Sequence, residues 1–361
     1  MKSERNSNIE LIKFIAIILI VVSHILPFYA KDSISYIDLK NCTTNVNTLF
    51  LMFYRYMGQV GNVIFIIASS YFLSENGKVK IHKVLSIILD TFAISMLFLA
   101  VIRFLNIQIP FKVILKQFFP ITYENNWFIT CYLLFYIVHP FLNIITNNID
   151  KEKLFKTTSF MVILYSFVQF IFKNKFFYTK LIGFIMIYFI TVYIKRYKIS
   201  FSRDRKKLVK INICSILLLI IFLIILNVIG IRVGFLNNKI IYFCELYNPI
   251  ILSIGFSIFL LFTNLNLGHN KIINFLSSLT LLIYLIHDNY LFRMYINPKI
   301  FDMIYYNFSF RYLAIITPIV STIILGISIM LAIFYRCSIQ KITSIISNKI
   351  SKSCDKIIKN F

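Results

Sequence analysis

The sequence predicts an all-α integral membrane protein, a polytopic bundle of about ten transmembrane helices. Of its 361 residues, 59% are hydrophobic and only 14% are charged, and the mean hydropathy is +0.79. Soluble domains use about half apolar and a quarter charged residues, so water could not cover this much apolar surface. In lipid, every backbone polar group must be paired within its own segment, which long apolar runs achieve by forming helices.

Ten apolar runs are long enough to cross a bilayer, which takes roughly 20 residues per helix. They are residues 9–29, 50–73, 84–105, 127–147, 155–172, 176–194, 211–230, 244–263, 273–292 and 312–335. Only a short loop around Lys173 and Lys175 separates the fifth run from the sixth, so nine to eleven helices fit the pattern. The first run resembles a signal peptide, but Lys13 interrupts its apolar core and no cleavage motif follows. We therefore expect an uncleaved first helix.

The distribution of Lys and Arg predicts that both termini are cytoplasmic. Positive residues are enriched in cytoplasmic loops, and the most basic loop, residues 195–207, falls on the same side as the amino terminus when ten helices are counted. Residues 1–335 are predicted to form the transmembrane domain. Residues 336–361 space isoleucines among lysines, which predicts a short basic amphipathic tail helix on the anionic inner leaflet.

The positions of the basic residues and of the cysteines exclude several functions. A net charge of +24 would suggest a nucleic-acid partner in a soluble chain. Here the basic residues lie between apolar runs, so we expect contacts with membrane lipids and none with nucleic acid. The six cysteines are scattered without a C-x-x-C pair. The sequence therefore predicts neither a metal site nor a disulfide framework.

Three ionisable residues lie in the first helix, where such groups are costly and usually functional. These are Glu10, Lys13 and His24. The eleven-residue step from Lys13 to His24 places both on one face of a helix, roughly 16 Å apart along its axis. Lys13 alone would also fit an interfacial lysine paired with Glu10, and His24 an interfacial histidine without a task. Histidine is, however, the commonest general acid or base.

Four stretches in order resemble the membrane acyltransferase-3 superfamily. They are RNSNIELIKFIAIILIVVSH, GNVIFIIASSYFL, NNWFITCYLLFYIVHPFLN and LSSLTLLIYLIHDNYLFR. The first helix of that family carries Arg or Lys, ten residues and then His, a spacing that Lys13 and His24 match. Ser70 and Leu282 depart from the pattern, because the family usually has glycine there. Both place a side chain where close helix packing favours none.

This resemblance implies an enzyme that transfers an acyl group, usually acetyl from acetyl-CoA, to a carbohydrate hydroxyl, often on a cell-surface polysaccharide or its lipid-linked precursor. It implies His24 as the general base and Lys13 as its basic partner. The donor, acyl-CoA, is then a substrate, and we expect no bound cofactor or metal. A base must activate the hydroxyl, and a donor group must stabilise the oxyanion of the thioester.

The predicted topology separates the candidate residues by depth. His24, Asn126, Trp127, His287 and Asp288 fall towards the outer half of the membrane. Together with Glu10, the last four are the candidate substrate-binding residues. The candidate donor-binding residues lie in the cytoplasmic loop and are Lys78, Lys80 and Lys83, which we expect to bind the CoA phosphates.

Plainer interpretations exist for each of these residues. Trp127 is typical of an interfacial tryptophan. His287 and Asp288 also fit a helix-end pair, with Arg293 as a solvated outer charge, and the loop lysines fit ordinary positive-inside residues.

Two other functional classes fit a polytopic bundle. A transporter or flippase for a lipid-linked glycan would be expected to have discontinuous helices and repeat symmetry, and the sequence has no convincing repeat. A polysaccharide polymerase usually has an acidic residue in a large outer loop, and the predicted outer loops are short. For the acyltransferase, any soluble partner that completes transfer on the outer face is expected to be a separate polypeptide. The expected location is the plasma membrane of a bacterium.

Overall fold

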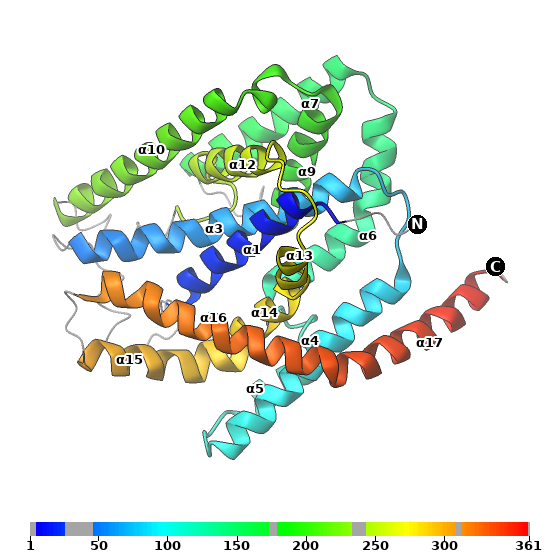
Figure 1. The fold of residues 1–361 in the computed structure, drawn as a ribbon, viewed down its shortest axis with the longest axis vertical. Helices are drawn as coiled ribbons and strands as arrows, with labels where there is room; N and C mark the ends of the chain where they lie inside the picture. The colour runs from blue at the N-terminus through cyan, green and yellow to red at the C-terminus, as the bar shows by residue number, and fades with distance from the viewer. Residues whose placement is uncertain (1–4, 26–45, 173–178, 233–242, 308–311, 360–361) are drawn as a thin grey trace.

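The computed structural model describes residues 5–25, 46–172, 179–232, 243–307 and 312–359, and within these ranges the chain forms helices and loops without a strand. Among the described residues, seven helical segments are long and apolar enough to cross a membrane. They are α1 (Ser7–His24), α3 (Val46–Leu73), α4 (Ile81–Phe104), α6 (Trp127–Asn147), the run from α7 (Lys151–Val162) through η1 (Ile163–Val168) to α8 (Gln169–Phe172), α10 (Arg205–Arg232) and α16 (Leu313–Cys337). Figure 1 shows them as one bundle. The chain is thus an all-helical membrane protein.

The predicted number of about ten spanning helices is not confirmed, because three runs fall outside this set. The sixth run forms α9 (Lys180–Tyr197), which carries basic residues at both ends, and the eighth forms α12 (Pro249–Thr263), which has only 15 residues. The ninth is divided into α13 (Lys271–Ser278) and α14 (Thr280–His287). Beyond α14 the chain bends by 53° into Phe292–Ile304, and this bent pair would make an eighth span. The loop around Lys173 and Lys175 lies outside the described residues.

The remaining helices are short or lie at the edge of the bundle. They are α5 (Phe111–Phe118), η2 (Ser200–Arg203), η4 (Phe292–Ile296), α15 (Asn297–Asn307) and the carboxyl-terminal α17 (Ile339–Lys359). α1 begins and α16 ends at the same end of the bundle (Figure 1). We call this the inner end, following the predicted cytoplasmic termini, and the opposite end, where α1 finishes, the outer end.

Helix α1 lies in the middle of the bundle and contacts α3, α12, α13, α14 and α16. Half of its residues are buried, and Ile12, Ile17 and Ile20 are almost fully enclosed. Two glycines of α3 permit its close approach to α1. A Cβ atom at Gly58 would lie 2.0 Å from Ser23 Oγ, and one at Gly61 would lie 2.6 Å from the backbone oxygen of Ala16. Small residues at such crossings let helix backbones pack closely in membranes.

Replacing Gly61 with alanine is therefore expected to destabilise the bundle. The new methyl group would overlap a backbone carbonyl, so α1 and α3 must separate, and overpacking of this kind costs about 1–3 kcal/mol or more. Thermal unfolding of the purified protein in detergent would measure the loss. Gly326→Ala in α16 is the matched control, because a Cβ atom there meets no atom within 4 Å. Equal melting temperatures for both variants would contradict the close crossing.

The two departures from the family pattern are both accommodated inside the bundle. Ser70 is fully buried, and its hydroxyl has no hydrogen-bond partner among the described residues. Leu282 is 2% exposed and belongs to the apolar core. Neither side chain takes part in the polar clusters described below.

Candidate active site

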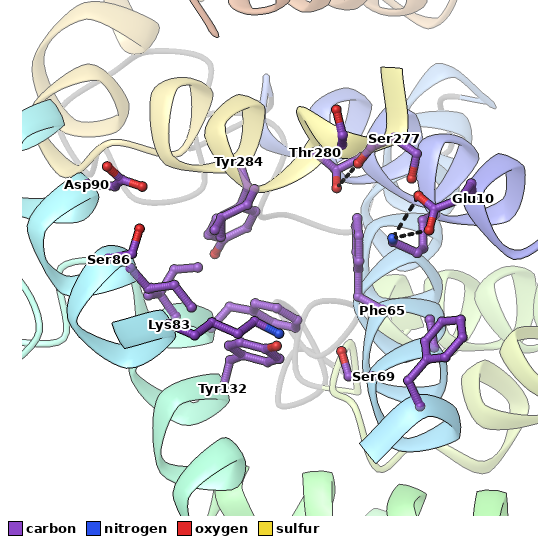
Figure 2. A pocket seen from close by; sticks show the side chains of 18 of the residues that line it. Glu10, Phe65, Ser69, Lys83, Ser86, Asp90, Tyr132, Ser277, Thr280 and Tyr284 are labelled. Carbon is purple, nitrogen blue, oxygen red and sulfur yellow. Dashed lines mark hydrogen bonds and ion pairs between the residues drawn. The ribbon is translucent and has the colours of Figure 1, made fainter. Parts of the chain in front are cut away.

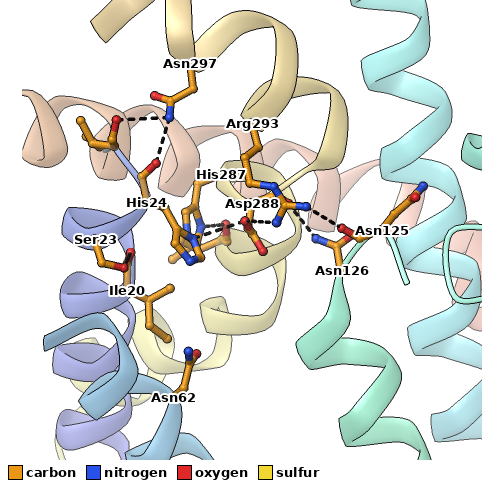
Figure 3. Close-up of polar contacts among 12 residues, drawn as sticks. Ile20, Ser23, His24, Asn62, Asn125, Asn126, His287, Asp288, Arg293 and Asn297 are labelled. Carbon is orange, nitrogen blue, oxygen red and sulfur yellow. Dashed lines mark hydrogen bonds and ion pairs between the residues drawn. The ribbon is translucent and has the colours of Figure 1, made fainter. Parts of the chain in front are cut away.

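A polar cluster forms at the outer end, where α1 finishes beside the end of α14. His24 is the last residue of α1, and His287 is the last residue of α14. Their rings stack with centroids 5.3 Å apart. His24 Nδ1 lies 3.2 Å from His287 Nε2 and 3.4 Å from Asp288 Oδ1. Figure 3 shows these three side chains pointing toward one another.

The hydrogen bonds of this cluster determine which nitrogen of His24 can act as a base. His287 Nδ1 lies 2.7 Å from the backbone oxygen of Ile283, so it carries a proton and donates it. When both rings are neutral, His287 Nε2 is then an acceptor, and His24 Nδ1 must be the donor. The lone pair of His24 therefore lies on Nε2, which has no partner among the described residues. This tautomer is the one that a general base needs.

A buried ion pair holds Asp288 in place. Arg293 Nη1 donates to Asp288 Oδ1 at 2.9 Å, and their side chains are 14% and 1% exposed. Arg293 Nη2 donates to the backbone oxygen of Asn125, and Asn126 Nδ2 donates to the backbone oxygen of Asp288 at 2.8 Å. The start of α6 is thus joined to the histidine pair. Arg293, which also fitted a solvated outer charge, is instead part of this cluster.

The end of α1 is fixed by an amide from α15. Asn297 Nδ2 donates to the backbone oxygen of His24 at 2.9 Å and to that of Ile25 at 3.3 Å. These carbonyls lack partners within α1 because the helix ends there. Asn297 is 2% exposed, so this contact is shielded from solvent. It sets the position of the His24 backbone, while Asp288 and His287 orient its ring.

This cluster is not arranged as a metal centre. Two histidines and a carboxylate meet here, but no three His, Cys, Asp or Glu side chains in the described ranges are placed to hold a metal ion.

A cavity of about 520 Å³ opens from the inner end of the bundle. Its cationic lining residues are Arg5, Lys13 and Lys83, and its aromatic ones include Phe65, Phe128, Tyr132 and Tyr284. In Figure 2, Lys83, Tyr132 and Tyr284 point into the same space from different helices. Lys13 is paired with Glu10, which also lines the cavity, at 3.0 Å. The cavity therefore combines three cations, one of them paired with a carboxylate, with aromatic walls.

Tyr284 connects this cavity to the histidine cluster. Its ring lines the cavity, and its centroid lies 6.5 Å from that of His24 and 5.7 Å from that of His287. Tyr284 precedes His287 by three residues, so both project from one face of α14. The cavity thus reaches from cations at the inner end to the ring that contacts His24.

The loop with the predicted donor-binding lysines is held by α6. Asn143 Nδ2 donates to the backbone oxygens of Leu73 and Asn76, both at 2.9 Å. The Lys83 ammonium lies 4.9 Å from the centroid of the Tyr136 ring. These contacts fix the turn between α3 and α4, and with it the position of Lys83 at the cavity.

The structure separates the predicted site residues into two groups. His24, Asn126, His287 and Asp288 meet in the outer cluster. Glu10, Lys13 and Lys83 line the inner cavity, whereas Lys78 and Lys80 are exposed and are not among its lining residues. Trp127 follows Asn126 but packs under the ammonium of Lys180, 4.1 Å from its ring centroid. Lys13 does not contact His24, consistent with the eleven residues between them.

Four residues of these sites were missed by the sequence analysis. Arg5 and Asp90 line the cavity, and Arg293 and Asn297 support the outer cluster. Asp90 carried a usable signal, because it is a carboxylate inside an apolar run. Arg293 and Asn297 carried none, because only the bend after α14 brings Arg293 to the backbone of Asn125 and Asn297 to that of His24.

These two sites define a membrane protein with a histidine–carboxylate cluster at one end of the bundle and a cation-lined cavity that reaches toward it from the other. The acyltransferase-3 family, described as an acyltransferase domain, matches residues 6–336, and the chain belongs to this family. No curated protein and no solved structure matches the chain.

Proposed function

We propose that this protein is an integral membrane O-acyltransferase. It moves an acetyl or other short acyl group from acyl-CoA to a hydroxyl of a cell-surface polysaccharide or its lipid-linked precursor, in the plasma membrane of a bacterium. Membership of the family supports acyl transfer. The observation that carries the finer proposal is the cavity that extends from Arg5 and Lys83 to Tyr284, beside the ring of His24.

The inner part of the cavity suits a CoA thioester. Phosphate groups are recognised by Arg and Lys through charge-assisted hydrogen bonds, and three such residues line the cavity. Lys78 and Lys80 lie in the same loop and would contact phosphates at the mouth. The aromatic walls fit the less polar pantetheine arm, whose end would bring the thioester toward Tyr284.

The outer cluster supplies the chemistry that the acceptor needs. His24 Nε2 takes the proton of a sugar hydroxyl as its oxygen attacks the thioester carbonyl, which forms a carbon–oxygen bond and an oxyanion. When the oxyanion collapses, the carbon–sulfur bond breaks, and His24 returns the proton to the CoA thiolate. Asp288 stabilises the imidazolium that exists between these steps. Asn126, Trp127 and His287 are proposed to border the acceptor.

The acetyl content of the surface polysaccharide tests this function. Base-released acetate from purified polysaccharide is compared between cells with and without the protein. Loss of acetate without the protein, and its return on complementation, is the expected result. Unchanged acetate content would contradict the proposed acceptor class.

Substitution of Lys83 by glutamine tests the donor site. We expect the Kd for acetyl-CoA to rise about tenfold, since a charge-assisted hydrogen bond contributes about 1.5–3 kcal/mol. Binding of radiolabelled acetyl-CoA to the purified protein in lipid nanodiscs measures this change. Lys153→Gln is the control, because Lys153 is 74% exposed at the start of α7 and away from the cavity. Equal affinities of the two variants would place the donor elsewhere.

A further inference from the structure

Asp90 is a buried carboxylate that the proposed chemistry does not use. It lies in α4, roughly 14 Å along the axis from the first residue of that helix, and is 1% exposed. Three side chains donate to it: Tyr335 Oη at 2.9 Å and Thr343 Oγ1 at 2.7 Å to Oδ1, and Gln340 Nε2 at 3.0 Å to Oδ2. All three donors are neutral. Burying a carboxylate in a spanning helix costs desolvation energy. An ionisable residue at such a position is therefore a candidate for a functional role.

The donors come from the end of α16 and the start of α17, so Asp90 attaches the carboxyl-terminal helix to α4. The face of α17 that is turned inward carries Thr343, Ser347 and Ser351, which are 6%, 2% and 7% exposed. Their four-residue spacing forms one stripe of small polar residues, a pattern that allows close helix packing in membranes. The predicted tail helix is therefore docked against α4, which it contacts along this stripe.

The opposite flank of α17 keeps its predicted amphipathic character. The exposed apolar residues opposite the stripe are Ile342 and Ile345, which are 59% and 67% exposed. Ile346 and Ile350 are also exposed but lie at the edge of the stripe, since Ile350 follows Thr343 by seven residues. This flank fits contact with lipid, as expected from the sequence. Docking on α4 and contact with the leaflet therefore use different faces of the same helix.

This docking brings α17 to the inner cavity. Gln340 and Asp90 both line the cavity that also holds Lys13 and Lys83. The family match ends at residue 336, so Gln340 and Thr343 lie beyond it. The Gln340 carbonyl oxygen has no hydrogen-bond partner among the described residues and is available to an amide N–H. The pantetheine arm of CoA contains such amides.

We propose that Asp90 clamps α17 as an additional wall of the donor cavity, through which Gln340 contacts the pantetheine arm of acyl-CoA. Asp90 is a positioning residue in this arrangement, because it acts through the helix that it holds. The inference rests on the proposed function in one respect, which is that the cavity binds an acyl-CoA donor. Donor affinity in this chain then depends on a helix outside the family domain.

Two measurements on the full-length protein in nanodiscs test this proposal. The first is the labelling of a single cysteine by a membrane-impermeant maleimide, with the native cysteines replaced by serine. The cysteine is placed at Ser347, which is buried, or at Asn348, which is exposed on α17. The second is the Kd for radiolabelled acetyl-CoA. Both are made with Asp90→Ala and with Thr343→Val, which removes one hydroxyl while retaining the side-chain shape. Thr343→Ser keeps the hydroxyl, and Ser344→Ala, whose hydroxyl bonds only within α17, is the control.

We expect Ser347→Cys to be protected in the otherwise unchanged protein and to react as fast as Asn348→Cys when Asp90 is alanine. The Kd for acetyl-CoA should rise about tenfold in Asp90→Ala and less in Thr343→Val, with Thr343→Ser and Ser344→Ala unchanged. Gln340→Ala should raise the Kd without exposing Ser347→Cys.

Three results would overturn the proposal, and each identifies a different fault. Rapid labelling of Ser347→Cys with Asp90 intact would refute docking. Release of α17 with an unchanged Kd would refute its role as a wall, while leaving the proposed donor site intact. Absence of acetyl-CoA binding in the unaltered protein would refute the donor site itself. If Asp90→Ala does not fold, Thr343→Val decides between these results.

Discussion

Replacing His24 with glutamine is expected to lower acyl transfer by roughly 10²–10⁴-fold, the contribution of a positioned general base. Glutamine occupies a similar volume, and its amide can still donate to Asp288 or His287. It cannot take a proton from a hydroxyl. The acetyl content of the surface polysaccharide, in cells whose only copy carries the substitution, should therefore fall to the level of cells without the protein.

The control for this experiment is His269→Gln. His269 is exposed in the loop before α13 and does not line the cavity, so its replacement should leave the acetyl content unchanged. The amount of each variant in the membrane is measured in parallel, because loss of the protein would also remove acetate. Normal acetylation by His24→Gln at normal protein levels would contradict the role of His24 as the base.

Replacing Asp288 with asparagine is the second large effect, with an expected fall in acyl transfer of about 10²–10⁴-fold. The carboxylate accepts from Arg293 and faces the Nδ1 proton of His24. An asparagine amide group turned toward His24 would favour the tautomer with its proton on Nε2, which blocks the base. The imidazolium formed during transfer would also lose its counterion. Asp150→Asn is the matched control, because Asp150 caps α7 outside the site and asparagine caps equally well.

A purely structural role for Asp288 makes a different prediction. Removing one partner of a buried ion pair costs about 3–5 kcal/mol, because the other charge stays buried. The double variant Asp288→Asn, Arg293→Gln removes both charges and should recover much of the melting temperature. We expect it to remain inactive. Recovery of acyl transfer together with stability would show that Asp288 supports only the fold.

Several structural features of this protein could be predicted from local sequence patterns. Long apolar runs predict membrane helices because an isolated segment in lipid must pair its own backbone groups. The eleven-residue spacing of Lys13 and His24 sets their separation along one helix, whatever the helix packs against. The ion pair of Glu10 with Lys13 is likewise a property of an i, i+3 step. These features depend on residues within a few turns of one another.

Other features depend on contacts between residues far apart in the chain, which no local pattern contains. The bend after α14 brings Asn297 to the backbone of His24 and lets Arg293 join the backbone of Asn125 to Asp288, so that a possible surface charge becomes part of the site. The predicted number of spanning helices is not confirmed, and one reason is that hydropathy does not reveal a break within an apolar run such as the one between α13 and α14.

The tail helix illustrates the same division. Its amphipathic pattern predicted a helix at the membrane surface, and the lysines between its isoleucines gave no sign of a docking partner. Asp90 and the stripe of Thr343, Ser347 and Ser351 lie about 250 residues apart in sequence. Only the tertiary structure brings them together, because a polar group inside the membrane is stabilised by whichever donors the fold supplies.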